Sequence, residues 1–274
     1  MKKLNYHKIV SPGSSIGYGG IFFLCMTALN YALERDIELY IQTYNTSYSL
    51  NINNWEVVFE QPFDIKKKDV NSLEKCTDWD LGPPLYSYGG DDRKRFQDIN
   101  FVTSQRKIIK KYAKPKTEFI NKVKEFLNPY KGKKILGIHR RGRDHFTSGH
   151  ASGQGNKINE KYIKSIVDKY IDNYDYLFVT SDEKETYESL NCLYPGKVIF
   201  FDNKEKFKNN DVGIHSLNLS EEEKIEVIKS LMMEVFILSK CDRMLLMNSN
   251  VSHMALFFSE TKDYEFYDNH VNYR

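Results

Sequence analysis

The stretch KKILGIHRRGRD, residues 133–144, carries the clearest structural signal in this chain. The apolar run from Ile135 to His139 predicts a short buried strand, and arginines 140, 141 and 143 follow at its end. In open α/β sheets, ligands bind at the carboxyl ends of the strands. Arginine suits oxyanions because its planar fork is always charged and can hold phosphate through two hydrogen bonds. The stretch therefore predicts a phosphorylated ligand at a strand end.

Strands and helices alternate on both sides of this stretch, which predicts an α/β fold with a parallel, Rossmann-like sheet in the second half. Strands are expected at 135–139, 177–180, 198–201 and 244–247, and helices at 160–170, from 181–182 onward, at 221–239 and from about 251. In the first half, a strand ends at 9–10, a helix is expected at 21–35, a strand at 37–41 and a helix at 116–127. Residues 64–95 are expected to form an irregular segment without regular helices or strands. The turn at 129–132 predicts a junction between domains 1–130 and 131–274.

The composition is that of a globular protein, with 41% hydrophobic and 28% charged residues among 274. A net charge of +3, from 40 basic and 37 acidic side chains, argues against a general nucleic-acid binder. The four cysteines form no Cys-x-x-Cys pair, which favours a reduced protein. No signal peptide pattern is visible, and the most apolar stretch, 21–33, is shorter than the roughly 20 residues that span a bilayer. We therefore expect no integral membrane segment and a cytoplasmic location.

Two further turns have features of a phosphate site. Gly17-Tyr18-Gly19-Gly20 would let the backbone approach a ligand and present amides at a helix N-terminus, but it also fits an ordinary strand-to-helix turn. It is not a P-loop. Ser249 and Asn250 lie between a strand and a helix, where they suit either a phosphate or a helix N-cap.

Several carboxylates allow two interpretations each. Asp144 could hold a neighbouring arginine through an ion pair or act as a base. Asp182, with Glu185 three positions later, matches a helix-capping pair. Glu234 falls among apolar residues of the long helix, so it is either a partly buried carboxylate with a partner or a charge at the rim. Ser220 and Glu223 predict a capping box at the start of that helix.

Three of these motifs, in this order, resemble the fucosyltransferase superfamily of core α1,6-fucosyltransferases, rhizobial nodulation fucosyltransferases and protein O-fucosyltransferases. Its first motif, His-x-Arg-x-x-Asp after a strand, is matched by His139, Arg141 and Asp144. Its second, a strand ending in Thr-Asp or Ser-Asp, is matched by residues 179–182. Its third, a helix ending Phe-Leu-Ser-x-x-Asp before a strand and a serine-rich turn, is matched by residues 237–255.

The resemblance implies a GT-B architecture, in which two Rossmann-like domains with parallel sheets face each other across a cleft. It implies inverting, metal-independent transfer of fucose from GDP-fucose to a glycan or glycoconjugate hydroxyl, with no cofactor and no bound metal. By position, Arg141 would contact the diphosphate and stabilise the departing GDP, His139 and Glu234 would recognise guanine, and Ser249 would meet the β-phosphate. The implied donor-binding residues are Gly17, Gly19, Gly20, His139, Arg141, Asp182, Glu234, Ser249 and Asn250.

The chain also departs from the family pattern. Gly142 stands where the α1,6 and nodulation enzymes have a second arginine, and Glu234 stands where the family prefers aspartate. Residues 146–155 hold no carboxylate at the place of the proposed base, so Asp144, His145 or His150 is the candidate. The missing carboxylate motivates an alternative: a catalytically idle sugar-nucleotide or glycan-binding protein of the same fold.

A metal-dependent hydrolase that uses the histidines at 139, 145 and 150 is a third hypothesis. It is disfavoured because these histidines share one glycine-rich loop without a supporting carboxylate cluster.

Overall fold

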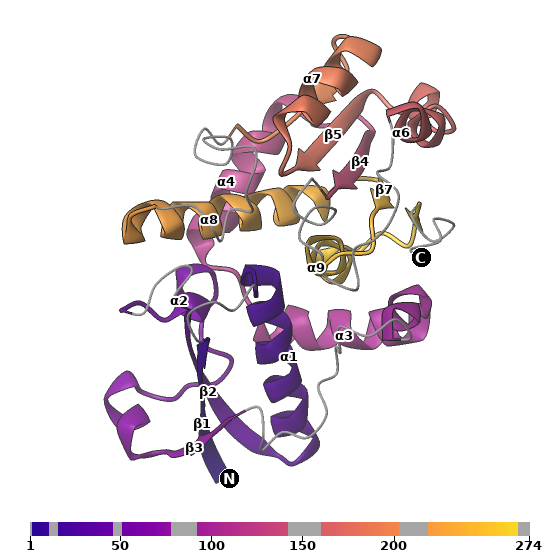
Figure 1. Cartoon of the computed structure of the whole chain (residues 1–274). Helices are drawn as coiled ribbons and strands as arrows, with labels where there is room; N and C mark the ends of the chain where they lie inside the picture. The colour runs from indigo at the N-terminus through magenta and orange to yellow at the C-terminus, as the bar shows by residue number, and fades with distance from the viewer. Residues whose placement is uncertain are drawn as a thin grey trace. The chain divides into compact units, whose positions relative to one another are not determined.

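The computed structural model describes residues 2–10, 16–45, 51–77, 92–141, 160–202 and 219–267. The chain divides into two compact units, which we term unit 1 (Met1–Ile120 with Asn218–Lys229) and unit 2 (Asn121–Leu217 with Ser230–Arg274). Each unit contains a parallel β-sheet and helices (Figure 1). The predicted α/β class with parallel sheets is therefore confirmed. The division falls within a helix at residues 120 and 121, and the domain boundary at 130 and 131 stays a prediction.

Unit 1 has the strand order β2-β1-β3. Its strands are β1 (Lys2–Val10), β2 (Ile37–Asn45) and β3 (Glu74–Cys76). Helix α1 (Tyr18–Glu34) joins β1 to β2 and is buried along most of its length. It begins at Tyr18 and not at Ile21, so the prediction of its start was wrong. Gly19 and Gly20 belong to its first turn, where they are buried.

Amide side chains cover the outer edge of β2, which is an edge strand among those described. Asn53 donates to the carbonyl of Ile41 at 2.6 Å and accepts from the backbone N–H of Thr43 at 3.0 Å. Gln61 donates to the same carbonyl at 2.9 Å and accepts from the N–H of Ile41 at 2.9 Å. These side chains satisfy backbone groups that another strand would otherwise pair with.

The least predictable part of the sequence contains a regular helix. Its described elements are α2 (Asn54–Val58), the 3-10 helices η1 (Lys67–Ser72) and η3 (Asp92–Gln97), and α3 (Ile99–Tyr112). Helix α3 was not predicted, although Asp98 caps it by accepting from the N–H of Asn100 at 2.8 Å. Its buried residues include Gln105, which exchanges hydrogen bonds of 3.2 and 3.3 Å with Asn30 of α1. The buried glutamine therefore interrupts the apolar stripe that would have revealed the helix, and its tertiary partner is invisible in the local sequence.

Unit 2 has the strand order β6-β5-β4-β7-β8, with all neighbours parallel. The strand that comes first in sequence, β4, lies in the middle, with later strands added on both sides. The order reverses between β4 and β7, so their carboxyl ends form the topological switch point where α/β sheets bind ligands. The strands are β4 (Ile135–Arg140), β5 (Tyr176–Ser181), β6 (Val198–Ile199), β7 (Arg243–Leu246) and β8 (Tyr264–Phe266).

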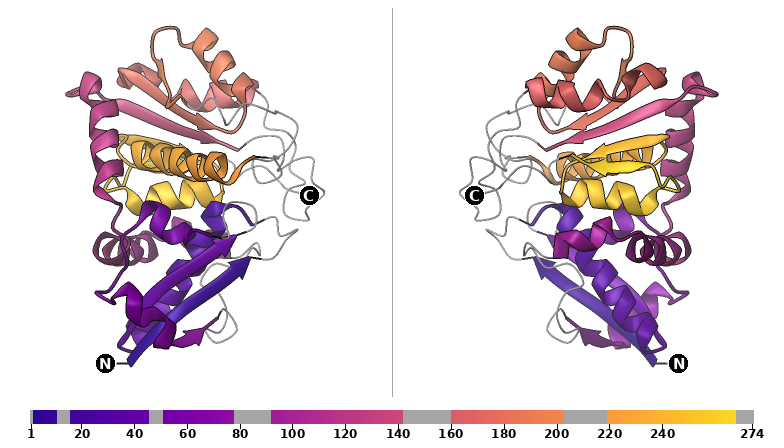
Figure 2. Two further views of the ribbon diagram at one scale, coloured as in Figure 1. Left: turned by 90° about the vertical axis from the view of Figure 1, so that its left-hand side faces the viewer. Right: turned by 90° about the vertical axis from the view of Figure 1, so that its right-hand side faces the viewer.

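Helices cover both faces of this sheet (Figures 1 and 2). On one face lie α6 (Glu160–Val167) and α7 (Lys184–Leu193), and on the other the second half of α8 (Glu221–Leu238) and α9 (Asn250–Phe258). Helix α4 (Thr117–Leu127) contacts the α8 face through the rings of Phe126 and Phe178, whose centres are 5.9 Å apart. Two further 3-10 helices, η4 (Asn128–Tyr130) and η5 (Ile171–Asn173), join these elements.

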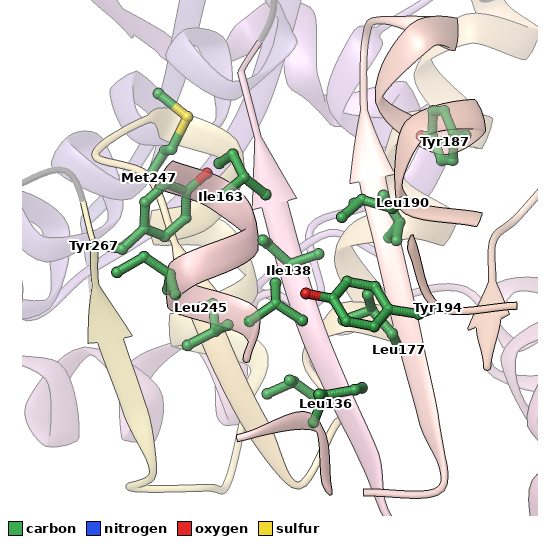
Figure 3. Packing of buried hydrophobic residues seen from close by; sticks show 14 residues of the cluster. Leu136, Ile138, Ile163, Leu177, Tyr187, Leu190, Tyr194, Leu245, Met247 and Tyr267 are labelled. Carbon is green, nitrogen blue, oxygen red and sulfur yellow. The ribbon is translucent and has the colours of Figure 1, made fainter. Parts of the chain in front are cut away.

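A cluster of buried apolar residues closes the α6 and α7 face (Figure 3). Leu136 and Ile138 of β4 and Leu245 of β7 pack there with Ile163 of α6 and Leu190 of α7. Alternate residues of β4 therefore face this cluster, and the residues between them face α8 and α9. The sheet is buried on both faces, as its near-continuous apolar strands predicted.

The opposite face admits no side chain at Gly137. A Cβ atom there would lie 2.5 Å from Leu238 Cδ1 and 2.9 Å from Cys241 Sγ. The C-terminal end of α8 therefore packs directly against the backbone of β4. Gly137 is needed for this close approach and not for an unusual backbone angle.

Of the remaining predictions about secondary structure, one is confirmed and two are wrong. The capping box is confirmed, with Ser220 N–H donating to Glu223 at 2.8 Å and Glu223 N–H donating to Ser220 at 3.2 Å. Strand β8 was missed because it has only three residues. Helix α7 begins at Lys184, later than predicted. Among the helices of the described ranges, none has the length and apolar character needed to cross a membrane.

Candidate functional site

The side chain of His139 lies at the switch point between β4 and β7. Its Nδ1 is 2.8 Å from Ser252 Oγ and 3.3 Å from Ser249 Oγ, and the residue is only 4% exposed. Ser249 also caps α9 by accepting from the N–H of Ser252 at 3.3 Å. The end of β4 is further tied down by the hydroxyl of Tyr267, which donates to the carbonyl of His139 at 2.9 Å. The predicted N-cap at Ser249 is confirmed, and Asn250 is the first residue of α9.

Ser252 was not predicted to be part of this site. It is fully buried, and its hydroxyl makes the shorter of the two contacts with His139. Its position three residues after the N-cap serine was the available signal, because residues at this spacing lie together in the first turn of a helix. A serine hydroxyl can donate or accept, so both contacts at Nδ1 fit either neutral tautomer of His139, and they fix the orientation of the ring.

The two adjacent arginines at the end of β4 point in different directions. Arg140 is buried: its Nη1 donates to Thr186 at 2.9 Å, and its Nη2 is 3.5 Å from Glu183 Oε2. Arg141 keeps 31% of its side chain exposed, and its Nε is 3.9 Å from Asp182 Oδ2. Successive strand residues face opposite sides of a sheet, which explains the divergence. Of the two, Arg141 is the one that solvent can reach.

Asp182 lies beside Arg141 and does not cap α7. The N-cap of α7 is Glu183, which makes no side-chain capping bond, so the capping interpretation of Asp182 was wrong. The turn is closed differently: Ser181 Oγ accepts from the N–H of Glu183 at 3.1 Å. Because α7 starts later than predicted, the Asp182 carboxylate is directed to the end of β4 and not to the helix.

Glu234 is a buried carboxylate with partners, and the rim interpretation was wrong. It is 1% exposed, accepts from Thr180 Oγ1 at 2.8 Å, and lies 3.4 Å from the hydroxyl of Tyr187. That hydroxyl also accepts from the N–H of Ser181 at 2.7 Å. Burial raises the pKa of Tyr187 well above its ordinary value, so the phenol stays protonated. Glu234 therefore lies beneath the carboxyl end of β5.

The glycine motif lies in unit 1, at the start of α1. Gly17 is the N-cap, has a φ of −72°, and offers no side-chain cap. The N–H of Gly20 donates to the carbonyl of Gly17 at 2.9 Å, which closes the first turn. Gly19 is buried within that turn. This geometry fits a strand-to-helix turn, and the role of Gly17, Gly19 and Gly20 as a donor loop stays a prediction.

Four residues that the sequence places near the site lie outside the described residues: Arg143 and the base candidates Asp144, His145 and His150. The ion pair expected between Asp144 and an arginine is therefore untested. Within the described ranges, no group of three or more His, Cys, Asp or Glu side chains could hold a metal ion.

Comparison with known proteins identifies the fold of this chain. No protein-family model and no curated protein sequence matches the chain. Among solved structures, the NodZ α1,6-fucosyltransferase soaked with GDP-fucose has a TM-score of 0.58 at 13% identity, covering 94% of this chain and 92% of that one. NodZ from Bradyrhizobium has a TM-score of 0.57 at 14% identity, covering 93% and 91%. POFUT1 in complex with GDP-fucose has a TM-score of 0.57 at 11% identity, covering 97% and 98%. The chain has the GT-B fold of these fucosyltransferases, so the resemblance indicated by the three motifs is confirmed at the level of fold.

Proposed function

We propose that this protein is a glycosyltransferase that moves fucose from GDP-fucose to a hydroxyl group of a glycan or glycoconjugate, with inversion and without a metal. The observation that carries the proposal is the position of Arg141. A partly exposed guanidinium emerges from the buried end of β4 at the switch point, in a chain with a fucosyltransferase fold. The donor would be held mainly by the C-terminal domain.

The turn between β7 and α9 offers a second group for the diphosphate. Ser249 and Asn250 stand at the N-terminus of a nine-residue helix, where backbone N–H groups and the helix dipole favour an anion. Ser249 Oγ is within 3.3 Å of His139, so the serine and the histidine belong to one site. An anion held there would lie at the carboxyl ends of β4 and β7.

Guanine recognition is assigned to His139 and Glu234. A carboxylate can accept from both guanine N1–H and the 2-amino group, and it has about four lone-pair positions. Glu234 already accepts from Thr180, so direct contact with a base would require the carboxylate to share or exchange that bond. Nucleotide selectivity would then depend on an acceptor-only group that uracil cannot satisfy in the same way.

The chemical step would break the bond between the anomeric carbon and the β-phosphate oxygen while the acceptor oxygen attacks from the opposite face. The bonding electron pair leaves with GDP, and the acceptor proton passes to a base, for which Asp144, His145 and His150 are the candidates. Arg141 would stabilise the charge that develops on the diphosphate. Removing one such preorganised donor from an active site typically costs about 100- to 1000-fold in rate.

Calorimetry with GDP, GDP-fucose, GDP-mannose and UDP-sugars tests the donor. We expect GDP and GDP-fucose to bind and UDP-sugars not to bind. Equal affinity for UDP-sugars and GDP-sugars, or no binding of either, would overturn the assignment. Binding of GDP-mannose but not of GDP-fucose would support the proposed nucleotide and replace the proposed sugar.

Product analysis with GDP-fucose then separates an enzyme from an idle binder. Transfer or donor hydrolysis at a measurable rate excludes the idle protein, and an unchanged rate in EDTA supports the metal-free reaction. Binding of GDP-fucose without any turnover on a panel of glycan acceptors would favour the idle alternative.

A further inference from the structure

Two adjacent arginines, one at the last position of β4 and one directly after it, meet two adjacent acids of the β5–α7 turn. Arg140 pairs with Glu183 and Arg141 with Asp182. The strands β4 and β5 are parallel neighbours, and the register places Arg140 opposite Ser181, the last residue before the acids. The two pairs therefore bracket the same short turn, one from each face of the sheet.

The two pairs differ in burial and in the separation of their charged groups. In the inner pair, the Arg140 and Glu183 side chains are 9% and 10% exposed. In the outer pair, the Arg141 and Asp182 side chains are 31% and 23% exposed, with a separation of 3.9 Å. A pair as long and as solvated as the outer one contributes little by itself, of the order of 0–1 kcal/mol. Its geometry therefore depends on what holds the turn that carries Asp182.

The inner pair is built into the turn by further hydrogen bonds. Arg140 donates to Thr186 Oγ1 at 2.9 Å, and that hydroxyl lies 3.3 Å from Ser181 Oγ and 3.4 Å from Glu183 Oε2. Ser181 Oγ in turn accepts from the N–H of Glu183. The guanidinium, the carboxylate and two hydroxyls thus connect the end of β4, the turn and the first turn of α7.

We propose that Arg140 and Glu183 are positioning residues for the donor site: their buried ion pair fixes the Ser181–Glu183 turn, and the turn holds Asp182 against Arg141. Contact at Nε orients the planar guanidinium of Arg141 toward the diphosphate. A buried ion pair is often no more stabilising than apolar side chains of similar volume, so placement of a neighbouring group is the better account of this one. For its effect on the ligand, the inference rests on the proposed function.

The test measures two quantities on the full chain: amide hydrogen exchange of residues 182–186 without ligand, and the Kd for GDP by calorimetry. In Arg140→Met we expect faster exchange in the turn and a Kd about tenfold higher, within the range of coupling between residues in one network. Asp182→Asn should raise the Kd by a similar factor. In the double variant the two losses should not multiply, because Arg140 acts through Asp182.

Arg243→Met is the matched control. Arg243 begins β7 at the opposite end of the same sheet, where it pairs with Asp263 and lies 3.8 Å from Glu265. Its loss should lower the Tm and leave both the exchange of the turn and the Kd for GDP unchanged. If Arg140→Met does not fold, Glu183→Gln removes the same ion pair with a smaller change in shape.

The outcomes separate the two proposals. Unchanged exchange and unchanged Kd in Arg140→Met would overturn the positioning role, as would losses that multiply in the double variant. If the unmodified protein does not bind GDP, the proposed function fails. Exchange of the turn then decides alone: faster exchange in Arg140→Met but not in Arg243→Met supports positioning, and equal exchange refutes it.

Discussion

The two ends of the unit 2 sheet treat charge differently. At the amino ends, carboxylates satisfy the backbone close to solvent: Asp175 accepts from the N–H of Lys134 at 2.8 Å, and Asp242 from the N–H of Ile135 at 2.7 Å. At the carboxyl ends, Arg140, Glu183, Glu234 and His139 are all buried. These residues are linked to hydroxyl groups as well as to opposite charges.

This difference in burial indicates that the charges at the amino ends serve stability and those at the carboxyl ends serve another purpose. Exposed carboxylates that receive a backbone N–H cost little to desolvate, so the amino ends hold groups that secure the strands. Buried ionisable groups are expensive unless every charge has a partner, and a chain that needed only stability would fill those positions with apolar side chains. Departures from local rules of this kind concentrate at functional sites.

Arg141→Ala should give the largest effect at the carboxyl ends. We expect transfer activity to fall by about 100- to 1000-fold with the Tm close to that of the unmodified protein, because a partly exposed side chain is lost. Initial rates with GDP-fucose and a thermal unfolding scan check this. Full activity in Arg141→Ala would refute the proposed mechanism, and Arg243→Met should keep its activity.

Gly137→Ala should disturb the packing of α8 against the middle of β4, between the two ends of the sheet. The new Cβ would lie 2.5 Å from Leu238 Cδ1, so we expect a loss of about 1–3 kcal/mol in the free energy of unfolding. Urea unfolding measures it. In a Cys241→Ala background the cost of Gly137→Ala should shrink, because the Sγ atom at 2.9 Å is gone. An equal cost in both backgrounds would show that Cys241 does not set the fit.

Ser252→Ala should show that the Ser252 hydroxyl contributes both to stability and to GDP binding at the carboxyl ends. Loss of the hydroxyl 2.8 Å from His139 Nδ1 should cost about 1 kcal/mol of stability and also weaken GDP binding. Ser239→Ala is the control, because that buried hydroxyl donates to the carbonyl of Phe236 at 2.7 Å. It should cost similar stability without changing the Kd for GDP. Equal Kd values in both variants would remove Ser252 from the site.

Asp175→Asn should give the smallest effect, at the amino ends. The hydrogen bond from the backbone of Lys134 lowers the pKa of Asp175 below its ordinary value of 3.8. The resulting stability is present above that value and is lost as the pH falls through the lower pKa of the folded protein. Acid unfolding of Asp175→Asn should therefore depend less on pH in this window. An identical pH profile would contradict the assignment.

The sequence was informative where one signal dominated. The apolar runs of β4, β5 and β7 predicted buried parallel strands, and the capping box predicted the start of α8. It was uninformative where tertiary partners replaced local signals. Helix α3 buries a glutamine against Asn30, and β3 pairs through only three residues.

By itself, the sequence determined the α/β class and the strand with arginines at its end, and the family resemblance singled out Arg141 among them. The tertiary structure decided what surrounds each arginine. Arg140 is turned toward Glu183, and Arg141 toward Asp182, about forty residues further along the chain. The physical reason is that strand alternation is a local property, whereas the partners of a side chain depend on which strand becomes the neighbour. That pairing is set by the order of strands in the sheet.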